Sequence, residues 1–174
     1  MKMTRRKLLA ILGIIALATP AVIFAFTTYL STSSTFTIGN NMQVSSLGIG
    51  YNEPASFQGT YSSCTAGTFP AWTCPNPAGG DIFASDTITW ALIVESDRPS
   101  TTAQASVSAG GFTAFTTSYA YLPLATSSGP ASGSLTSGLP TMVGGSWYEI
   151  YIQVQIGTAA TPGSTPTFSV AFGA

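Results

Sequence analysis

The residue types that perform most acid–base and nucleophilic chemistry are scarce in this 174-residue chain. Histidine is absent, and four of the five cations lie in the first seven residues: Lys2, Arg5, Arg6 and Lys7. A serine nucleophile needs a positioned base beside it, and neither histidine nor lysine occurs after residue 7 to serve as one. We therefore expect no catalytic residues, no cofactor and no small-molecule substrate, and we predict that the chain is not an enzyme.

Two pairs of acids are the remaining candidates for chemistry. Asp81 with Asp86, and Glu95 with Asp97, are close enough in sequence to form a weak Ca²⁺ site or a carboxylate acid–base pair. Nothing around them resembles a sugar site, so solvated acids near strand ends are the simpler interpretation. We expect no metal site.

The chain has two cysteines, Cys64 and Cys74. An even number in an exported chain predicts a disulfide, and closing so short a loop stabilises by roughly 2.5–3 kcal/mol in the chain-entropy model. No basic residue lies nearby to lower a thiol pKa, and the chain lacks further zinc ligands. A structural crosslink is therefore the prediction.

The first 25 residues have the three parts of an export signal. A basic region precedes the apolar run Leu8–Phe26, and the small residue Ala25 lies near its end. We predict cleavage between Ala25 and Phe26, with Ala21 as a second candidate site, and an extracellular protein. The paired arginines also resemble a twin-arginine signal. Two other interpretations stay open, because the run is long enough for a retained membrane anchor or for a type IV pilin helix.

Without this leader, the chain keeps one cation, Arg98, and six acids, a net charge of −5. One cation cannot neutralise a phosphate backbone, so we expect no nucleic-acid partner. Only 6% of all residues are charged. A surface with so few repelling groups is expected to adhere to copies of itself.

Hydrophobic periodicity after the leader is that of strands. Residues 147–156 alternate clearly, and Gly, Pro, Ser and Asn clusters separate the apolar runs. The predicted strands are 26–30 continuing to 36–38, 42–49, 56–61, 87–95, 103–108, 112–122, 147–156 and 167–172. Short strands with turn signals between them predict an all-β chain folded as an antiparallel β-sandwich. The low-complexity stretch 125–138 is predicted to be a surface loop.

An extended segment, residues 26–38, directly follows the predicted cleavage point. Five of its residues fall on even positions and so share one face of a strand: Phe26, Thr28, Leu30, Phe36 and Ile38. Phe26–Leu30 can fold back as an edge strand of its own domain. Alternatively, it can complete the sheet of the next subunit, an arrangement known as donor-strand complementation.

Ala25-Phe26, followed by Thr-Phe-Thr-Ile-Gly-Asn at 35–40, resembles the start of the TasA/camelysin family of biofilm matrix fibre proteins. In its abundance of hydroxyls and shortage of charge, the chain is also similar to AbpA-like archaeal bundling pilins. The resemblance implies a jelly-roll-like sandwich that polymerises through N-terminal donor strands and associates laterally. The chain lacks the many lysines and the longer inserted region of the bacterial members.

We therefore predict a signal peptide at 1–25, a donor strand and spacer at 26–38, and a β-sandwich domain at 39–174. The expected function is that of a structural subunit of an extracellular pilus. Its partners would be identical subunits joined head to tail, with lateral contacts between filaments in a biofilm. The alternative is a monomeric, membrane-anchored β-sandwich at the cell surface or in association with an S layer.

Overall fold

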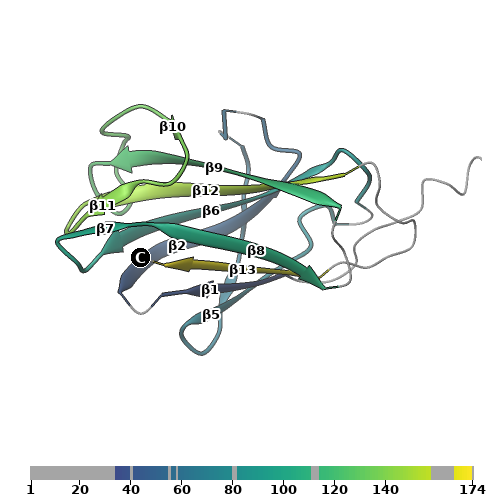
Figure 1. Ribbon diagram of the computed structural model, residues 1–174, viewed down its shortest axis with the longest axis horizontal. Helices are drawn as coiled ribbons and strands as arrows, with labels where there is room; N and C mark the ends of the chain where they lie inside the picture. Colours follow the sequence, from purple (N-terminus) through teal and green to yellow (C-terminus); the bar gives the residue numbers. More distant parts are fainter. Residues whose placement is uncertain are drawn as a thin grey trace, which may run out of the picture.

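The computed structural model describes residues 34–39, 41–54, 56–57, 59–79, 82–110, 114–157 and 167–173. Within these ranges the regular structure consists of strands alone, arranged mainly as two stacked sheets (Figure 1). The predicted all-β sandwich is confirmed. The predicted leader with its cleavage point at Ala25, and Phe26, Thr28 and Leu30, lie outside the described residues.

One sheet, here called sheet B, is antiparallel throughout. In spatial order it contains β10 (Thr136–Ser137), β9 (Phe115–Leu124), β12 (Trp147–Ile156), β6 (Thr87–Ser96), β2 (Met42–Tyr51) and β3 (Ser62–Ser63). β6 and β12 lie at its centre because their apolar residues are buried on the inner face and shielded on the outer face. Four of these strands have ten residues each, so sheet B forms the longer layer.

The second sheet, sheet A, contains one parallel pair. In spatial order it consists of β4 (Thr65–Ala66), β5 (Ala71–Cys74), β1 (Ser34–Ile38), β13 (Thr167–Gly173) and β8 (Gln104–Gly110). β1 runs parallel to β13 and antiparallel to β5, and β13 runs antiparallel to β8. A small sheet of β7 (Ser100–Thr102) and β11 (Thr141–Val143) lies at one end of the sandwich.

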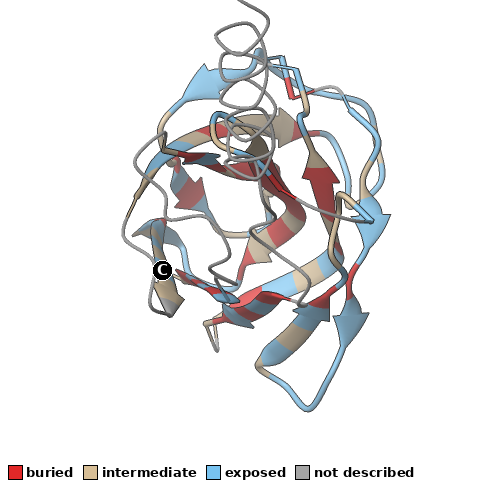
Figure 2. Ribbon diagram, turned by 90° about the vertical axis from the view of Figure 1, so that its right-hand side faces the viewer, coloured by how far each residue is buried: buried red, intermediate tan, exposed pale blue. Residues whose placement is uncertain are grey.

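The core lies between the two sheets. Buried residues alternate with exposed ones along β1 and β13, so both strands bury one face and expose the other. Figure 2, viewed end-on, shows buried stretches on strands all around this core. Trp90 of β6 is fully buried against Phe168 of β13, with ring centroids 6.1 Å apart.

The predicted disulfide between Cys64 and Cys74 is confirmed, with an S–S distance of 2.03 Å. The chain passes from sheet B to sheet A at Cys64, between β3 and β4. The Cys64 backbone N–H donates to Leu47 of β2, whereas Cys74 belongs to β5. The crosslink therefore joins the two sheets near one end of each.

The predicted strand at 56–61 is wrong, because the described part of that segment is a loop folded over the outer face of sheet B. Phe57 has a positive φ of 55°, which ends any strand there. Its ring stacks on Tyr151 of β12, with centroids 5.0 Å apart. Phe57 and the half-buried Tyr61 therefore pack on the outer face of sheet B instead of lying in a strand.

Candidate functional site

The sandwich has one side on which two strand edges are free, and we call it the open side. β8 is the last strand of sheet A, and on the described chain nothing pairs with its outer edge. On sheet B, β10 pairs with β9 only at Tyr121 and Ala120, so the first half of β9 is also unpaired. The two strands lie on the same side, because the Tyr119 hydroxyl of β9 donates to the Ala105 carbonyl of β8 at 3.5 Å.

The backbone of β8 is directed so that its outer edge can accept another strand. The Ala103 N–H donates to Pro140, and the Ala105 carbonyl accepts from Tyr119. Peptide groups alternate in direction along a strand, so those of Val107 and Ala109 also point away from β13. An exposed edge of this kind is a template for a further strand.

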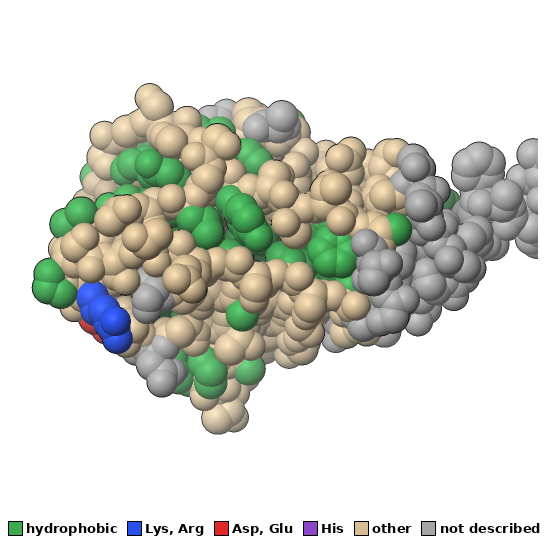
Figure 3. Space-filling model, viewed as in Figure 1, with side chains coloured by type: hydrophobic (Ala, Val, Ile, Leu, Met, Phe, Trp, Pro, Cys, Tyr) green, Lys and Arg blue, Asp and Glu red, His purple; other side chains and the backbone are tan. Residues whose placement is uncertain are grey.

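Apolar side chains line the open side. Ala105, Val107 and Ala109 are partly buried on the inner face of β8, and Phe115 and Tyr119 of β9 pack against the same core. Figure 3 shows apolar side chains gathered in a stripe along the middle of this face. The inner surface of the sandwich is thus incompletely covered between β8 and β9.

The structure places Phe36 and Ile38 in β1, within their own chain. Phe36 is 0% exposed and Ile38 is 1% exposed, and both belong to the main core. Donating them to a neighbour would open a gap between β5 and β13 and break two strand pairings. The predicted boundary at 38/39 is corrected accordingly: the described sandwich begins at Ser34, and a donor strand is limited to residues before it.

The outer face of sheet A carries small, uncharged side chains. Exposed hydroxyl side chains on β1, β8 and β13 include Thr35, Thr37, Ser108 and Ser169. The Thr35 hydroxyl donates to the Ser169 hydroxyl at 3.2 Å across β1 and β13. This hydroxyl face is therefore free of charge over its middle.

Two of the described acids, Asp86 and Asp97, have hydrogen-bond partners within the fold. The Asp86 carboxylate accepts from the Tyr51 hydroxyl, from Asn52 Nδ2 at 3.0 Å and from the Phe83 N–H at 2.7 Å. Asp97 accepts from Gln43 Nε2 at 3.3 Å. Asp81 lies outside the described residues, within which no group of three potential metal ligands occurs.

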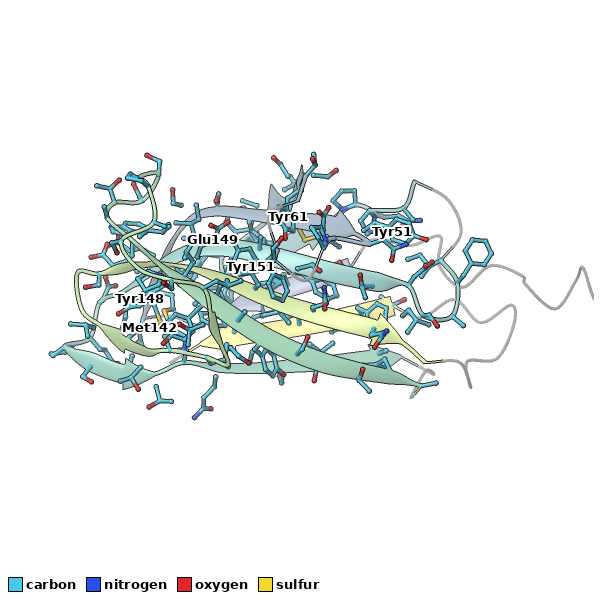
Figure 4. The ribbon with its side chains drawn as sticks, turned by 90° about the horizontal axis from the view of Figure 1, so that it is seen from above. Tyr51, Tyr61, Met142, Tyr148, Glu149 and Tyr151 are labelled. Carbon is cyan, nitrogen blue, oxygen red and sulfur yellow. A yellow bond between two sulfur atoms is a disulfide. The ribbon has the colours of Figure 1, made fainter. Side chains whose placement is uncertain are left out.

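The pKa values of three tyrosines are raised above the usual value for a phenol. Burial, reinforced by Asp86, raises the pKa of Tyr51 to about 12. Burial also raises the pKa of Tyr61, aided by Glu53, and that of Tyr151, aided by Glu149; Figure 4 shows Tyr61, Glu149 and Tyr151 near one another. These phenols stay protonated at neutral pH and are unsuited to act as bases there.

A shallow hollow of about 420 Å³ lies at the end of sheet A where β1 and β13 finish. Its lining includes Thr37, Gln104 and Phe172 but no charged side chain. Such a lining offers a few hydrogen bonds and no group that could activate a bound molecule.

Known proteins give no independent indication of function: no protein-family model matches the chain, and no significant match occurs among curated proteins or solved structures. In the described ranges, no helix is long and apolar enough to cross a membrane. The apolar run 8–26 lies outside those ranges. The features of this chain that bear on function are therefore the open side and the sequence that precedes β1.

Proposed function

We propose that this protein is the structural subunit of an extracellular filament, in which the segment Phe26–Leu30 of one copy completes the sandwich of the next. We call Phe26–Leu30 the donor segment. The observation that carries the proposal is the open side, where unpaired backbone and apolar side chains lie together on β8 and β9. The donor segment supplies the complementary feature, a strand pattern with Phe26 and Leu30 on one face.

Apolar burial and added backbone hydrogen bonds both favour this contact between subunits. Burying Phe26 and Leu30 contributes about 3–6 kcal/mol, at about 1.5–3 kcal/mol for each side chain. Backbone hydrogen bonds along the added strand contribute about 0.5–1.5 kcal/mol each. The donor segment and the open side are different parts of the chain, so the proposed contact is head to tail and continues without closing.

Lateral association of filaments is the second part of the proposed function. The hydroxyl face of sheet A carries Thr35, Thr37, Ser108 and Ser169 and no charge between them. Two such faces can approach without the electrostatic repulsion that keeps charged surfaces apart. Bundled filaments at a cell surface are consistent with this arrangement.

Electron microscopy of the purified mature chain tests the proposal. Filaments are expected from the chain that begins at Phe26, and folded monomers from a chain that lacks Phe26–Leu30. Unchanged filaments after this deletion would contradict donor-strand assembly. The sequence of the mature N-terminus separates the alternative class, because Met1 retained on a monomer would indicate an anchored surface protein.

A further inference from the structure

The direction of β1 determines how a donor segment meets its neighbour. β1 is parallel to β13, and β13 is antiparallel to β8, so β1 and β8 run in opposite directions. All subunits of a head-to-tail filament point the same way. A donor segment that continues β1 backwards, in line, therefore enters the neighbour antiparallel to β8. β8 and β9 run in opposite directions in Figure 1, so the same segment would be parallel to β9.

The length of chain before β1 sets how far the donor segment can reach. Residues 26–33 precede Ser34, and eight extended residues span at most about 26–29 Å. A five-residue strand takes about 17 Å of that length, and the polar residues 31–33 take about 10 Å to cross the junction. β8 has seven residues, so its edge is longer than the donor segment.

The side chains and backbone of β8 restrict the register. Ala105, Val107 and Ala109 face inward, and their peptide groups point toward the open side. Directly opposed residues in an antiparallel pair share a face, so the even positions of the donor, which include Phe26 and Leu30, must oppose these three residues. Thr28 opposite Val107 brings all three even positions into the pairing.

The neighbouring aromatic residues fit this register. Ala109 is paired with Phe168, whose ring centroid is 5.7 Å from that of Phe115 of β9. A phenylalanine added beside Ala109 would therefore lie next to Phe115. At the other end, the Tyr119 hydroxyl donates to the Ala105 carbonyl at 3.5 Å, a long hydrogen bond that a strand N–H could replace.

We infer that β8 is the acceptor edge, and that Phe26, Thr28 and Leu30 of one copy lie opposite Ala109, Val107 and Ala105 of the next. This inference rests on the proposed function and specifies its interface. The partner is a second copy of this chain. β9 covers the added strand from the side and is not its pairing partner.

A pair of proline substitutions tests the choice of edge. The Val107 N–H points away from β13, so Val107→Pro removes a donor that the β8–β13 ladder does not use. Thr117→Pro is the matched variant on β9, because the Tyr119 carbonyl accepts from Gly138 and odd positions there point away from β12. We expect folded monomers without filaments from Val107→Pro, and filaments like those of the parent from Thr117→Pro.

Filaments from Val107→Pro but not from Thr117→Pro would identify β9 as the acceptor. Loss of filaments in both variants would show that β9 also pairs with the donor. Filaments from both variants would exclude both β8 and β9 as the acceptor edge. Each of these results overturns the inference while leaving filament formation by the parent intact. A parent chain that forms no filaments overturns the proposed function as well. Circular dichroism separates misfolding from lost assembly.

Disulfide trapping in assembled filaments tests the register, including the case in which a proline variant fails to fold. The inferred register places Thr27 opposite Ser108, at a non-hydrogen-bonded position where Cα atoms are about 4.5 Å apart, within disulfide range. Thr27→Cys with Ser108→Cys should give a ladder of covalent oligomers. Thr27→Cys with Ser106→Cys is the shifted control and should give few.

A stronger ladder from the shifted pair would overturn the register. Intact filaments without crosslinks from either pair would also overturn the inferred register, because Thr27 would then lie opposite neither Ser108 nor Ser106. The native crosslink does not interfere, because Cys64 and Cys74 are buried and already bonded to each other.

Discussion

Ser34 is the first described residue of the sandwich and one of its few buried polar groups. Its hydroxyl is 3.3 Å from Trp90 Nε1, with Ser34 3% exposed and Trp90 0% exposed. The indole N–H can only donate, so it depends on this oxygen once it is buried. The contact holds the start of β1 against the centre of sheet B.

Replacing Ser34 with Ala is expected to destabilise the fold by about 1–3 kcal/mol, because it leaves the Trp90 N–H buried without an acceptor. Urea unfolding of the monomeric chain measures this as a lower midpoint with an unchanged slope. Thr35→Ala is the matched control, since its side chain is exposed on the outer face, and it should cost less than about 0.5 kcal/mol. Equal midpoints for the two variants would contradict the assigned role of Ser34.

At the scale of single elements, the Cys64–Cys74 crosslink acts on the weakest part of sheet A. β5 has four residues, and β4 beyond it has two, so few backbone bonds hold this hairpin to β1. Cys64 lies beside β2 of the other sheet. The crosslink therefore fixes a short hairpin that its own pairing would hold poorly.

Removing the crosslink with Cys64→Ala and Cys74→Ala is expected to cost about 2–3 kcal/mol, as the unfolded chain regains the freedom of the loop. Hydrogen exchange should show the amides of β5 losing protection before those of β12. Reduction of the parent chain provides the control, since it removes the bond without changing any side-chain carbon. Uniform loss of protection across both sheets would show that the crosslink is not local in its effect.

Long strands were predictable because their sequence carries the periodicity of burial. The strand 147–156 matches β12, and the predicted strands 87–95 and 167–172 end within one residue of β6 and β13. β5 was not predicted, since Ala-Trp-Thr-Cys is short and follows a Phe-Pro turn. The predicted loop at 125–138 is mainly irregular; it meets β9 through an isolated bridge between Ala131 and Leu124 and through β10 near its end.

The candidate site was predictable only in part, because it depends on strand order. The alternating pattern predicts that Phe36 and Ile38 share one face of a strand. It does not tell whether that face packs into the core of the same chain, as the structure has it, or into a neighbouring copy. The parallel pairing of β1 with β13 joins residues more than a hundred positions apart and leaves no local signal. The same holds for the free edge of β8, which exists because no other described strand follows it in sheet A.

At the scale of the whole molecule, the proposed head-to-tail contact and the proposed lateral contact use different surfaces. The first uses the open side between β8 and β9. The second uses the outer face of sheet A, where residues such as Thr35 and Ser169 present hydroxyls without charge. A change confined to the outer face should therefore separate bundling from polymerisation.

Ser169→Lys should leave filaments intact and prevent their bundling, because each subunit would add a cation to a face that otherwise carries none at its middle. Ser46→Lys is the control, with the same charge on the exposed outer face of sheet B at β2. Electron micrographs should show single filaments for the first variant and bundles for the second. Since exposed charges are screened by salt, bundles of Ser169→Lys should return as ionic strength rises. Bundles that persist in Ser169→Lys at low salt would place the lateral contact on another face.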